Sequence, residues 1–434
     1  MIELKVLFVS PRMVRRLVEP LPPLGLGYMA AVLEGLGVDV KICDMDILKL
    51  SYDEYRKIVS KEQPDIVGIT AITQQYTNGK QVAQVSKQEV PDCTVLMGGP
   101  HVTFLASESL KDCPDIDIVV RGEGEVTVTE IVQYCQGERG LDTVDGVTYR
   151  DNSTIRTTGE RVYIKDLDSL PLPARHLLPL EKYSEKGSVI TSRGCPGACS
   201  FCSSFRLLGK TFRPRSIQKV VDEIEFELMG KYHYREFFFI DDTFTFYMER
   251  TRELCEEILK RGLDVEWGCN TRVDKVSDEL LKIMSKAGCI RLCFGLESIH
   301  PETLTLLKKN IRPQQVLEAV SLAHKYGIDV NLAFMLGLPG ETPEMIKETI
   351  DFVADINLGP RQEITPLNPY PGTTLFEKSD ELGMEFTAQD WSEYDHPLFS
   401  VVETKECSKD DMVGVWTYIA KKLVAPSPLL RKEE

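Results

Sequence analysis

Short apolar runs recur along the first third of the chain, and amphipathic stretches separate them. The runs predict strands at 5–10, 39–44, 65–73, 93–98 and 116–121, and apolar spacing near i, i+3, i+4 predicts helices such as 25–36 and 76–89. Strands that alternate with helices form βαβ units, whose parallel sheet is covered on both faces. The pattern therefore predicts an α/β fold that begins with a doubly wound, Rossmann-like domain of five parallel strands over residues 1–150.

The alternation breaks after residue 136. The segment GERGLDTVDGVTYRDN has the pattern of a hairpin, and DLDSLPLPARHLLPL is rich in proline. Proline fixes φ and lacks a backbone donor, which makes it a poor member of a sheet. We expect residues 151–187 to be a linker that wraps between two domains and joins neither sheet.

The alternation restarts at residue 188. Strands are expected at 188–192, 235–241, 264–268, 289–295, 328–336 and 361–366, and helices at 216–230, 249–261, 277–287, 314–326 and 343–356. Six βα units in one direction predict a partial (β/α)6, TIM-like barrel over residues 188–380, with its site at the carboxyl ends of the strands. Residues 381–434 are expected to form a small appendage with one amphipathic helix near 409–424.

Length and charge narrow the possible functions. A chain of 434 residues exceeds what one core usually supports, in agreement with two domains. The net charge of −16, without any Lys/Arg-rich block, disfavours a nucleic-acid partner. No apolar stretch is long enough for a membrane span, and the start MIELKVLFVSP lacks a basic region and a cleavage site, so we expect a cytoplasmic protein.

The cysteines carry the strongest chemical signal. The chain has 12 Cys and 6 His, and Cys195, Cys199 and Cys202 lie together in the loop Thr191–Cys202, which also contains Gly, Pro and Ala. Small residues let a backbone curl around a bulky inorganic centre, and thiolates are the preferred ligands of iron–sulfur clusters. The alternative is a structural zinc site, but zinc needs a fourth ligand and no second Cys/His pair is in ligand spacing nearby. The other nine cysteines, Cys289 and Cys293 included, are expected to be core residues.

This Cys-x3-Cys-x2-Cys spacing, directly after the first barrel strand, resembles the signature of the radical S-adenosylmethionine (SAM) enzymes. The resemblance implies that Cys195, Cys199 and Cys202 hold a [4Fe-4S] cluster whose fourth iron binds SAM. Reductive cleavage of SAM would then give a 5′-deoxyadenosyl radical that abstracts hydrogen from a substrate. The implied electron donor is a flavodoxin or ferredoxin, and the implied conditions are anaerobic.

Further segments at successive strand ends resemble the SAM-holding positions of the same family. The residues that the resemblance assigns to SAM are Phe201, Asp241, Asp242, Arg272, Glu297, Ser298, Gly337 and Asn368. Asp or Gly at one strand end is more often a turn residue. Five such segments in order, at consecutive strand ends, favour a common ligand.

The first domain lacks the fingerprints of nucleotide binding. Gly25-Leu26-Gly27 has no third Gly at the proper spacing, and no Gly-x4-Gly-Lys-Ser/Thr exists. Glycine-rich edges instead follow its strands and indicate an uncharged crevice for a large planar ligand. The arrangement resembles the cobalamin-binding domain that precedes many radical SAM barrels. The residues expected to bind cobalamin are Leu24, Gly25, Thr70, Thr73, Gln74, Gln75, Tyr76, Gly98, Gly99, Pro100, His101, Gly122, Glu123 and Gly124.

Some residues of this set keep alternatives. The Asp-x-His-x-x-Gly motif that supplies an imidazole to cobalt is absent, so the resemblance implies cobalamin without histidine on the metal. One residue of Gln74-Gln75-Tyr76 is expected near the metal, with an ordinary helix start as the alternative. Glu123 and Glu125 alternatively cap a helix.

The resemblance favours a methyltransferase of the EC 2.1.1 type. A methyl group of SAM would pass through methylcobalamin to an unactivated carbon, with Tyr76 and Arg272 as catalytic residues. The expected substrate is a small metabolite or a protein side chain, such as a glutamine of methyl-coenzyme M reductase. The alternatives are a cyclase or rearrangement enzyme similar to the anaerobic magnesium-protoporphyrin ester cyclase, and a non-catalytic cobalamin or iron–sulfur carrier. A methylthiotransferase is disfavoured, because Ser10-Pro11 occupies the place of the first extra cysteine that it needs.

Overall fold

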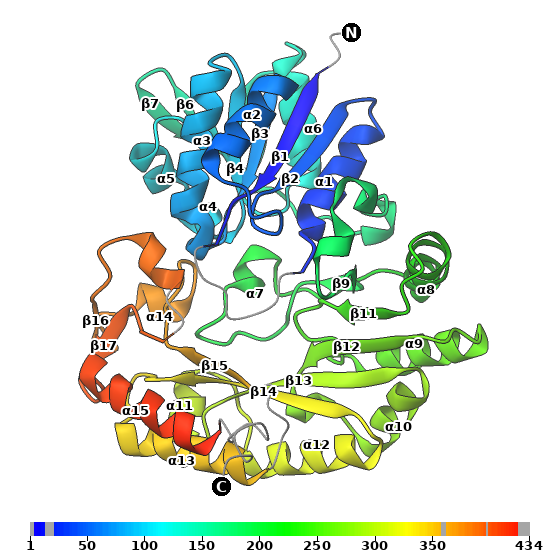
Figure 1. Ribbon diagram of the computed structural model, residues 1–434, viewed down its shortest axis with the longest axis vertical. Coiled ribbons are helices and arrows are strands. Elements are labelled where there is room, and N and C mark those ends of the chain that lie inside the picture. The colour runs from blue at the N-terminus through cyan, green and yellow to red at the C-terminus, as the bar shows by residue number, and fades with distance from the viewer. Residues whose placement is uncertain (1–3, 14–20, 357–361, 396–397, 424–434) are drawn as a thin grey trace, which may run out of the picture.

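The computed structural model describes residues 4–13, 21–356, 362–395 and 398–423. Figure 1 shows two stacked α/β units, with the N-terminal one (blue to cyan) above the second (green to yellow). The C-terminal segment (orange to red) lies beside the second unit and reaches up to the first.

The N-terminal unit is built on five parallel strands. These are β1 (Lys5–Ser10), β2 (Asp39–Asp44), β3 (Ile66–Thr70), β4 (Thr94–Gly98) and β5 (Ile118–Val120), in the order β2-β1-β3-β4-β5. The helices are α1 (Leu24–Glu34), α2 (Tyr52–Glu62), α3 (Tyr76–Glu89), α4 (Pro100–Phe104), α5 (Ala106–Asp112) and α6 (Glu125–Cys135). Apolar residues of α1 and α6 form the core on one face, and those of α2, α3 and α5 form it on the other. The doubly wound fold is confirmed.

A hairpin extends this sheet and corrects one expectation. Strands β6 (Val147–Asp151) and β7 (Thr154–Thr157) are antiparallel, and β6 pairs with the edge strand β5. The expectation that the segment before residue 187 joins neither sheet is therefore wrong for the hairpin. Val147 and Tyr149 are buried, so β6 satisfies the free edge of β5 and adds apolar contacts. The sheet thus runs past residue 150, and the ranges 1–150 and 188–380 stay proposed domain limits.

The second unit is a partial barrel of six parallel strands. They are β8 (Gly187–Val189), β11 (Glu236–Phe239), β12 (Glu266–Thr271), β13 (Cys289–Glu297), β14 (Asp329–Leu336) and β15 (Glu363–Pro366), hydrogen-bonded in chain order. The helices are α8 (Ile217–Asp222), the π-helical segment η6 (Glu223–Lys231), α9 (Met248–Lys260), α10 (Asp278–Lys286), α11 (Pro301–Leu306), α12 (Pro313–Lys325) and α13 (Pro343–Asp355). The expected barrel is confirmed, and residue 361 of its sixth expected strand lies outside the described residues.

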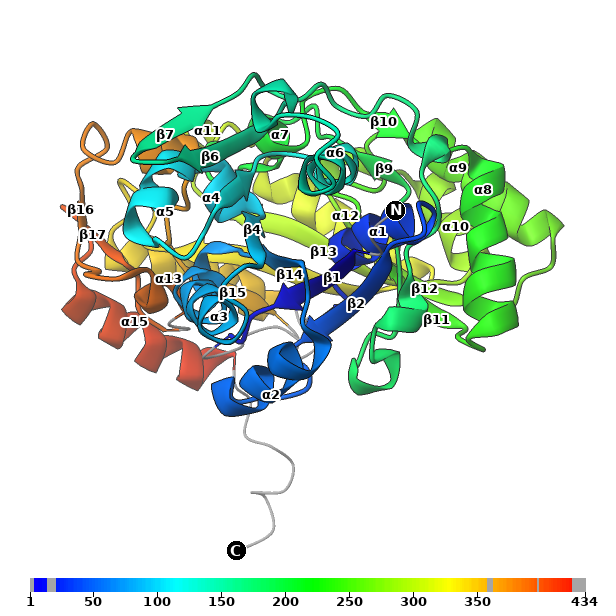
Figure 2. The ribbon, with the colours of Figure 1, turned by 90° about the horizontal axis from the view of Figure 1, so that it is seen from above.

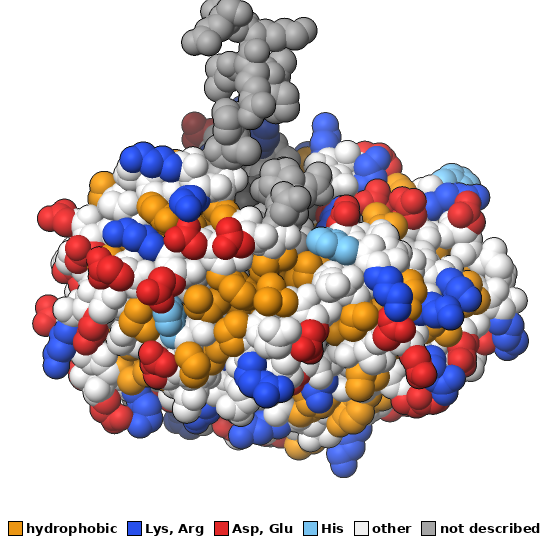
Figure 3. Space-filling model, turned by 90° about the horizontal axis from the view of Figure 1, so that it is seen from below, with side chains coloured by type: hydrophobic (Ala, Val, Ile, Leu, Met, Phe, Trp, Pro, Cys, Tyr) orange, Lys and Arg blue, Asp and Glu red, His pale blue; other side chains and the backbone are white. Residues whose placement is uncertain are grey.

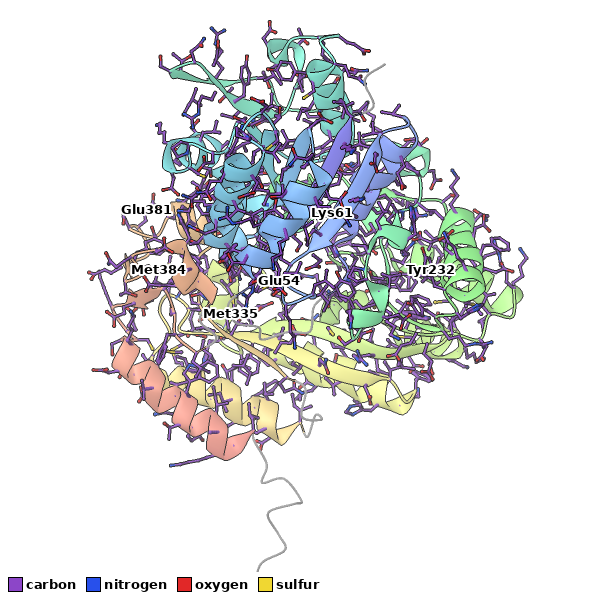
Figure 4. All side chains as sticks on the ribbon, turned by 45° about the horizontal axis from the view of Figure 1, so that its top comes forward. Glu54, Lys61, Tyr232, Met335, Glu381 and Met384 are labelled. Atoms are coloured by element: carbon purple, nitrogen blue, oxygen red, sulfur yellow. The ribbon has the colours of Figure 1, made fainter. Side chains whose placement is uncertain are left out.

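The C-terminal segment packs on both units. It contains α14 (Thr374–Glu377), β16 (Met384–Phe386), η8 (Trp391–Asp395), β17 (Val402–Thr404) and α15 (Lys409–Lys422). Figures 1 and 4 place the part that carries Met384 just below the N-terminal unit, and Met335 of β14 lies nearby in the barrel. The expected helix near 409–424 is present as far as the described residues extend.

The proline-rich linker is bound to both units through buried polar groups. Arg175 donates to the carbonyl of Ser188 (2.7 Å) and pairs with Glu223, which also pairs with Arg215 (2.5 Å). Tyr183 donates to Asp44 Oδ2 of the first sheet (2.6 Å). These buried contacts hold the linker in place although it forms no regular sheet of its own between residues 158 and 186.

A second buried network joins the units directly. Arg193 pairs with Glu123 (3.0 Å) and Glu125 (2.5 Å), and Arg213 also pairs with Glu123 (2.9 Å). All four side chains are at most 9% exposed. Burial lowers the pKa of Arg193, but its attraction to Glu125 and Glu123 outweighs this and raises that pKa overall. Figure 2 shows the N-terminal sheet lying over the barrel, which is the arrangement that this network holds.

Both signs of charge are spread over the outer face of the barrel. Figure 3 shows Lys/Arg and Asp/Glu interspersed there, with hydrophobic side chains gathered near the centre of the face. The described side chains visible on this face therefore form no basic patch for a phosphate backbone. Among the described helices, none combines the length and apolarity that crossing a membrane requires.

We expect Arg193→Met to lower the thermal unfolding midpoint by several degrees. The change leaves the Glu125 carboxylate buried without its partner, which typically costs about 3–5 kcal/mol. Differential scanning fluorimetry measures the effect, and Arg235→Met is the control, because the Arg235–Asp264 pair is exposed and such pairs contribute about 0–1 kcal/mol. Equal midpoints for the two variants would show that the buried network does not stabilise the chain.

Candidate active site

The three-cysteine loop follows β9 (Ser192–Arg193), which pairs with β10 (Arg213–Pro214). Gly194 opens the loop at φ +87°, and a Cβ there would lie 2.3 Å from the carbonyl oxygen of Thr211, so only glycine fits. Ser200 fixes the middle of the loop: its amide and hydroxyl donate to the carbonyls of Leu307 (3.0 Å) and Leu306 (2.8 Å). Its own carbonyl accepts from the amide of Leu375 at the start of α14 (3.0 Å). The loop is thus held by the barrel and by the C-terminal segment.

The thiols of this loop lie in one half-buried environment. Cys195, Cys199 and Cys202 are all free and partly exposed. Burial raises the pKa of the Cys195 and Cys202 thiols, and the nearby charges of Asp242 and Cys199 raise both further. The amide of Ser204, the first residue of α7 (Ser204–Leu207), points at Cys202 Sγ (3.4 Å).

This donor set fits a cluster better than a single ion. No group of three or more His, Cys, Asp or Glu side chains within the described parts of the chain is arranged around one metal ion. In a [4Fe-4S] cluster each thiolate binds a different iron, so the ligands need not converge on one point. Three free thiols on one fixed loop therefore agree with the cluster that the sequence predicts.

Asp241 and Asp242 follow β11 but do different things. Asp241 is fully buried and accepts hydrogen bonds from the amide (3.0 Å) and hydroxyl (2.9 Å) of Thr191 and from the hydroxyl of Ser192. These hydrogen bonds fix the approach to the cysteine loop, and a contact of Asp241 with SAM stays a prediction. Asp242 is exposed and lines the cavity described below. Desolvation by the surrounding protein raises the pKa of its carboxyl group.

Two charged residues expected to bind SAM, Arg272 and Glu297, form hydrogen bonds and ion pairs within the protein. The Arg272 fork donates to Asp274 (2.8 and 3.1 Å) and to the carbonyl of Lys309 (2.8 Å). Glu297, at φ +66°, pairs with the Lys309 ammonium, which lies 5.6 Å from the centre of the Phe201 ring. Arg272 and Glu297 are thus linked through Lys309, a residue that the sequence analysis did not single out.

The remaining residues assigned to SAM support the strand-end loops. Ser298 donates to Glu341 Oε1 (2.6 Å), whose Oε2 accepts from the amide of Leu338 (3.2 Å). Asn368 accepts from the amide of Val401 (3.0 Å), and Gly337 turns the chain at φ +77°. Burial raises the pKa of Glu341 to about 7. These contacts place the residues around the barrel mouth, and their SAM contacts stay a prediction.

A cavity of about 370 Å³ lies between the two units. Seven of the residues expected to bind cobalamin line it: Gly25, Thr70, Gly98, Gly99, Gly122, Glu123 and Gly124. The barrel contributes Arg193, Asp241 and Asp242. A Cβ built on Gly25 or Gly122 would meet no heavy atom within 4 Å, so these glycines leave open space at the edge of the sheet. The cavity wall fits a large planar group such as a corrin, and it continues into an apolar slot past Phe8, Gly68 and Leu96 that the sequence analysis missed.

The other residues of the expected cobalamin set lie elsewhere. Thr73, Gln74 and Gln75 form the 3-10 turn η1, where Gln74 donates to the Tyr370 hydroxyl (2.7 Å) and Gln75 to the Pro11 carbonyl (2.8 Å). Leu24 and Pro100 begin α1 and α4 and are absent from the lining of the cavity, as are Tyr76 and His101. Tyr76 is buried against His101 and donates to Asp112 (2.9 Å), so the structure gives it no contact with the cavity.

Glu123 and Glu125 show a role that sequence spacing could not reveal. Neither side chain caps α6 by a hydrogen bond; both pair with Arg193. Glu123 also accepts from the amide of Ile164 (2.8 Å). Their partners are about forty to ninety residues away along the chain.

Two family models match the two units in this order. The B12 binding domain model matches residues 13–132, and the radical SAM superfamily model matches residues 189–353. The chain belongs to the radical SAM proteins that carry a B12-binding domain, whose cofactors are a [4Fe-4S] cluster, SAM and cobalamin.

Curated relatives include methyltransferases and cyclases. An uncharacterized methyltransferase of Pyrococcus horikoshii is 38% identical over 377 residues, which cover 86% of this chain and 81% of the relative. The anaerobic magnesium-protoporphyrin IX monomethyl ester cyclase of Rubrivivax gelatinosus is 34% identical over 388 residues, 86% of this chain and 68% of the cyclase. Among solved structures, the radical SAM methyltransferase TsrM of Kitasatospora setae, with cobalamin and a [4Fe-4S] cluster bound, matches 98% of this chain and 90% of its own at a TM-score of 0.77 and 18% identity, which shows the shared fold.

We expect Gly25→Leu to reduce the cobalamin that the purified protein retains. The new side chain would project into the open space of the cavity, and Gly25 has no positive φ that would add backbone strain. Cobalt content and the visible spectrum measure the effect. Gly414→Leu is the matched control, because Gly414 is also a helical glycine with nothing within 4 Å and lies in α15. Unchanged cobalt in Gly25→Leu would mean that cobalamin binds elsewhere.

We expect Glu341→Gln to remove part of the pH dependence of stability. The folded pKa of Glu341, about 7, lies above its ordinary value of 4.5, so the folded state holds the proton longer and the wild type loses stability as pH rises through that window. The full loss is about 3 kcal/mol. Unfolding midpoints between about pH 5 and about pH 8 should fall less for Glu341→Gln than for the wild type. Glu344→Gln, at an exposed site in α13, should follow the wild type, and parallel curves for all three proteins would contradict the assignment.

Proposed function

We propose that the chain is a cobalamin-dependent radical SAM C-methyltransferase that transfers a methyl group from SAM to an unactivated carbon. One observation supports the proposal: Asp242 lines the cavity with the cobalamin-type glycine edges, and its charge raises the pKa of the Cys195 and Cys202 thiols. Methyl transfer by two cofactors requires that both face one space, and a residue shared in this way supports such an arrangement.

When bound, the cofactors would carry the methyl group and abstract hydrogen by radical chemistry. The chain would bind and orient the cofactors and the substrate. Cys195, Cys199 and Cys202 would hold the cluster, and Asp242 is the carboxylate open to the SAM ammonium. Arg272, Glu297 and Lys309 would orient the carboxylate and ribose, with Phe201 beside them. Arg193, held by Glu123 and Glu125, lines one side of the cavity.

Cobalamin would bind without histidine on cobalt. No histidine is among the described residues that line the cavity. His101, the one histidine among the residues expected to bind cobalamin, lines another cavity, and its Nδ1 lies 3.3 Å from the Thr73 hydroxyl. This placement supports the interpretation that the lower face of the metal meets no imidazole.

The cellular setting follows from the thiols. All twelve cysteines lie in the described parts of the chain and none is in a disulfide. Free thiols and an oxygen-sensitive cluster support a reducing, anaerobic cytoplasm with a flavodoxin or ferredoxin as electron donor. The methyl acceptor would be a small metabolite or a protein side chain, with the glutamine of methyl-coenzyme M reductase as one candidate.

A cyclase is the second candidate, because the cyclase of Rubrivivax gelatinosus is 34% identical over 86% of this chain. The two functions differ in the fate of the SAM methyl group. A methyltransferase moves the SAM methyl group to another molecule, whereas ring closure transfers no SAM methyl group to the product.

We expect the reconstituted holoprotein, given SAM with a deuterated methyl group under reducing anaerobic conditions, to place the label on cobalamin and to form 5′-deoxyadenosine. Mass spectrometry follows both products without a known substrate. Cys195→Ala/Cys199→Ala/Cys202→Ala should abolish 5′-deoxyadenosine, because no iron would then bind SAM. Cys293→Ala, another half-buried cysteine, is the control and should keep it. Formation of 5′-deoxyadenosine without labelled cobalamin would instead support the cyclase.

A further inference from the structure

A second cavity, of about 480 Å³, lies between the N-terminal unit and the C-terminal segment. Helices α3, α4 and α5 form one wall, and residues of α14, β16 and η8 form the other. Figures 1 and 2 both show the C-terminal segment beside α5. It shares no lining residue with the cavity assigned to cobalamin. The second cavity therefore needs its own explanation.

Its floor is made of aromatic rings. His101 stacks on Tyr76 with ring centres 4.1 Å apart and planes at 29°, and Trp391 meets His101 edge-on at 4.7 Å. On the wall formed by the C-terminal segment, the ring centres of Tyr394 and Phe376 lie 5.1 Å and 6.3 Å from that of Trp391. Such flat faces offer stacking and edge contacts to another planar ring. The floor therefore favours a planar aromatic group over an aliphatic one.

The floor carries no positive charge. Burial lowers the pKa of His101 to about 3, and the nearby ammonium of Lys80 lowers it further. The ring is thus neutral at physiological pH, although Asp112 lies close enough to oppose the shift. An aromatic ligand meets neutral rings there, and the ammonium among the described lining residues is that of Lys80, which lies 5.1 Å from the centre of the Tyr76 ring and is paired with Asp112.

The rim of the cavity is acidic. Glu108, Asp112 and Asp390 line it together with a single ammonium, that of Lys80, which is bound to Asp112 (2.7 Å). Hydrogen bonds from Ser392 and Thr77 outweigh burial and lower the pKa of Asp390, so it is charged at neutral pH. Glu108 is exposed and has no ion-pair partner among the described residues. Two carboxylates are thus left for a cationic group.

We propose that this cavity binds a small planar aromatic amine. The ring would lie on His101 and Trp391, and the ammonium would meet Glu108 and Asp390 at the rim. The proposal concerns reversible binding and rests on the second cavity alone, so it holds whether or not the chain transfers a methyl group. Tyr76 and His101 of this cavity follow strands β3 and β4 along the chain. The last residues of those strands, Thr70 and Gly98, line the first cavity.

Tyramine is a suitable probe, because it joins a phenol ring to an ammonium group. Isothermal titration calorimetry of the full-length holoprotein under anaerobic conditions should show one site per chain. 3-(4-Hydroxyphenyl)propionate, which replaces the ammonium by a carboxylate, and 2-cyclohexylethylamine, which lacks the planar ring, should each bind at least about tenfold more weakly. Equal affinities for the three compounds, or no binding of tyramine, would overturn the proposal.

Variants place the probe in the cavity. Glu108→Gln should weaken tyramine binding several-fold, and Glu302→Gln, at an exposed carboxylate of α11, is the matched control. Cobalt content and circular dichroism check that the variants are folded and loaded. Tyramine binding that Glu108→Gln leaves unchanged would mean that tyramine binds elsewhere and would refute this site.

Discussion

The arrangement of the two cofactor sites depends on the buried ion pairs between Arg193 and the carboxylates of Glu123 and Glu125. Removing charges from water is costly, and the cost is recovered only while partners stay in contact at good geometry. Arg193 lies two residues before Cys195, and Glu123 and Glu125 flank Gly124 at the edge of the first sheet. A shift of one unit against the other would separate these charges. The pairs therefore fix where the cysteine loop stands relative to the glycine edges.

The features that sequence predicted well are those set by local spacing. Strand and helix alternation follows from periodicity, which needs no knowledge of distant partners, so both sheets could be derived. The cysteine triplet lies within one loop, and its spacing alone predicts an iron–sulfur cluster. Gly98 and Gly122 line the cavity from the ends of β4 and β5, because parallel strands present their carboxyl ends at one edge, and Gly25 lines it from the first turn of α1.

What sequence could not give are contacts between residues far apart along the chain. Tyr76 and His101 were expected to bind cobalamin, yet Trp391, which lies 290 residues beyond His101, covers that ring and forms a separate cavity with it. Lys309 and Glu341 carry no motif of their own and gain importance only from Glu297 and Ser298. The hairpin β6–β7 was assigned to the linker because proline and glycine nearby masked its pairing with β5. In each case tertiary packing decided what local pattern left open.

The pair Asp241-Asp242 shows how one dipeptide serves two structural purposes. The carboxylate of Asp241 is consumed by three hydrogen bonds to Thr191 and Ser192, the residues that lead into Arg193. Through them the end of β11 is tied to the same network that joins the two units. Asp242, one residue on, lines the cavity, and its charge raises the pKa of the Cys202 thiol. A chain of direct contacts thus runs from the second barrel strand through β9 to the start of α6, and the one carboxylate left outside it faces the space between the cofactors.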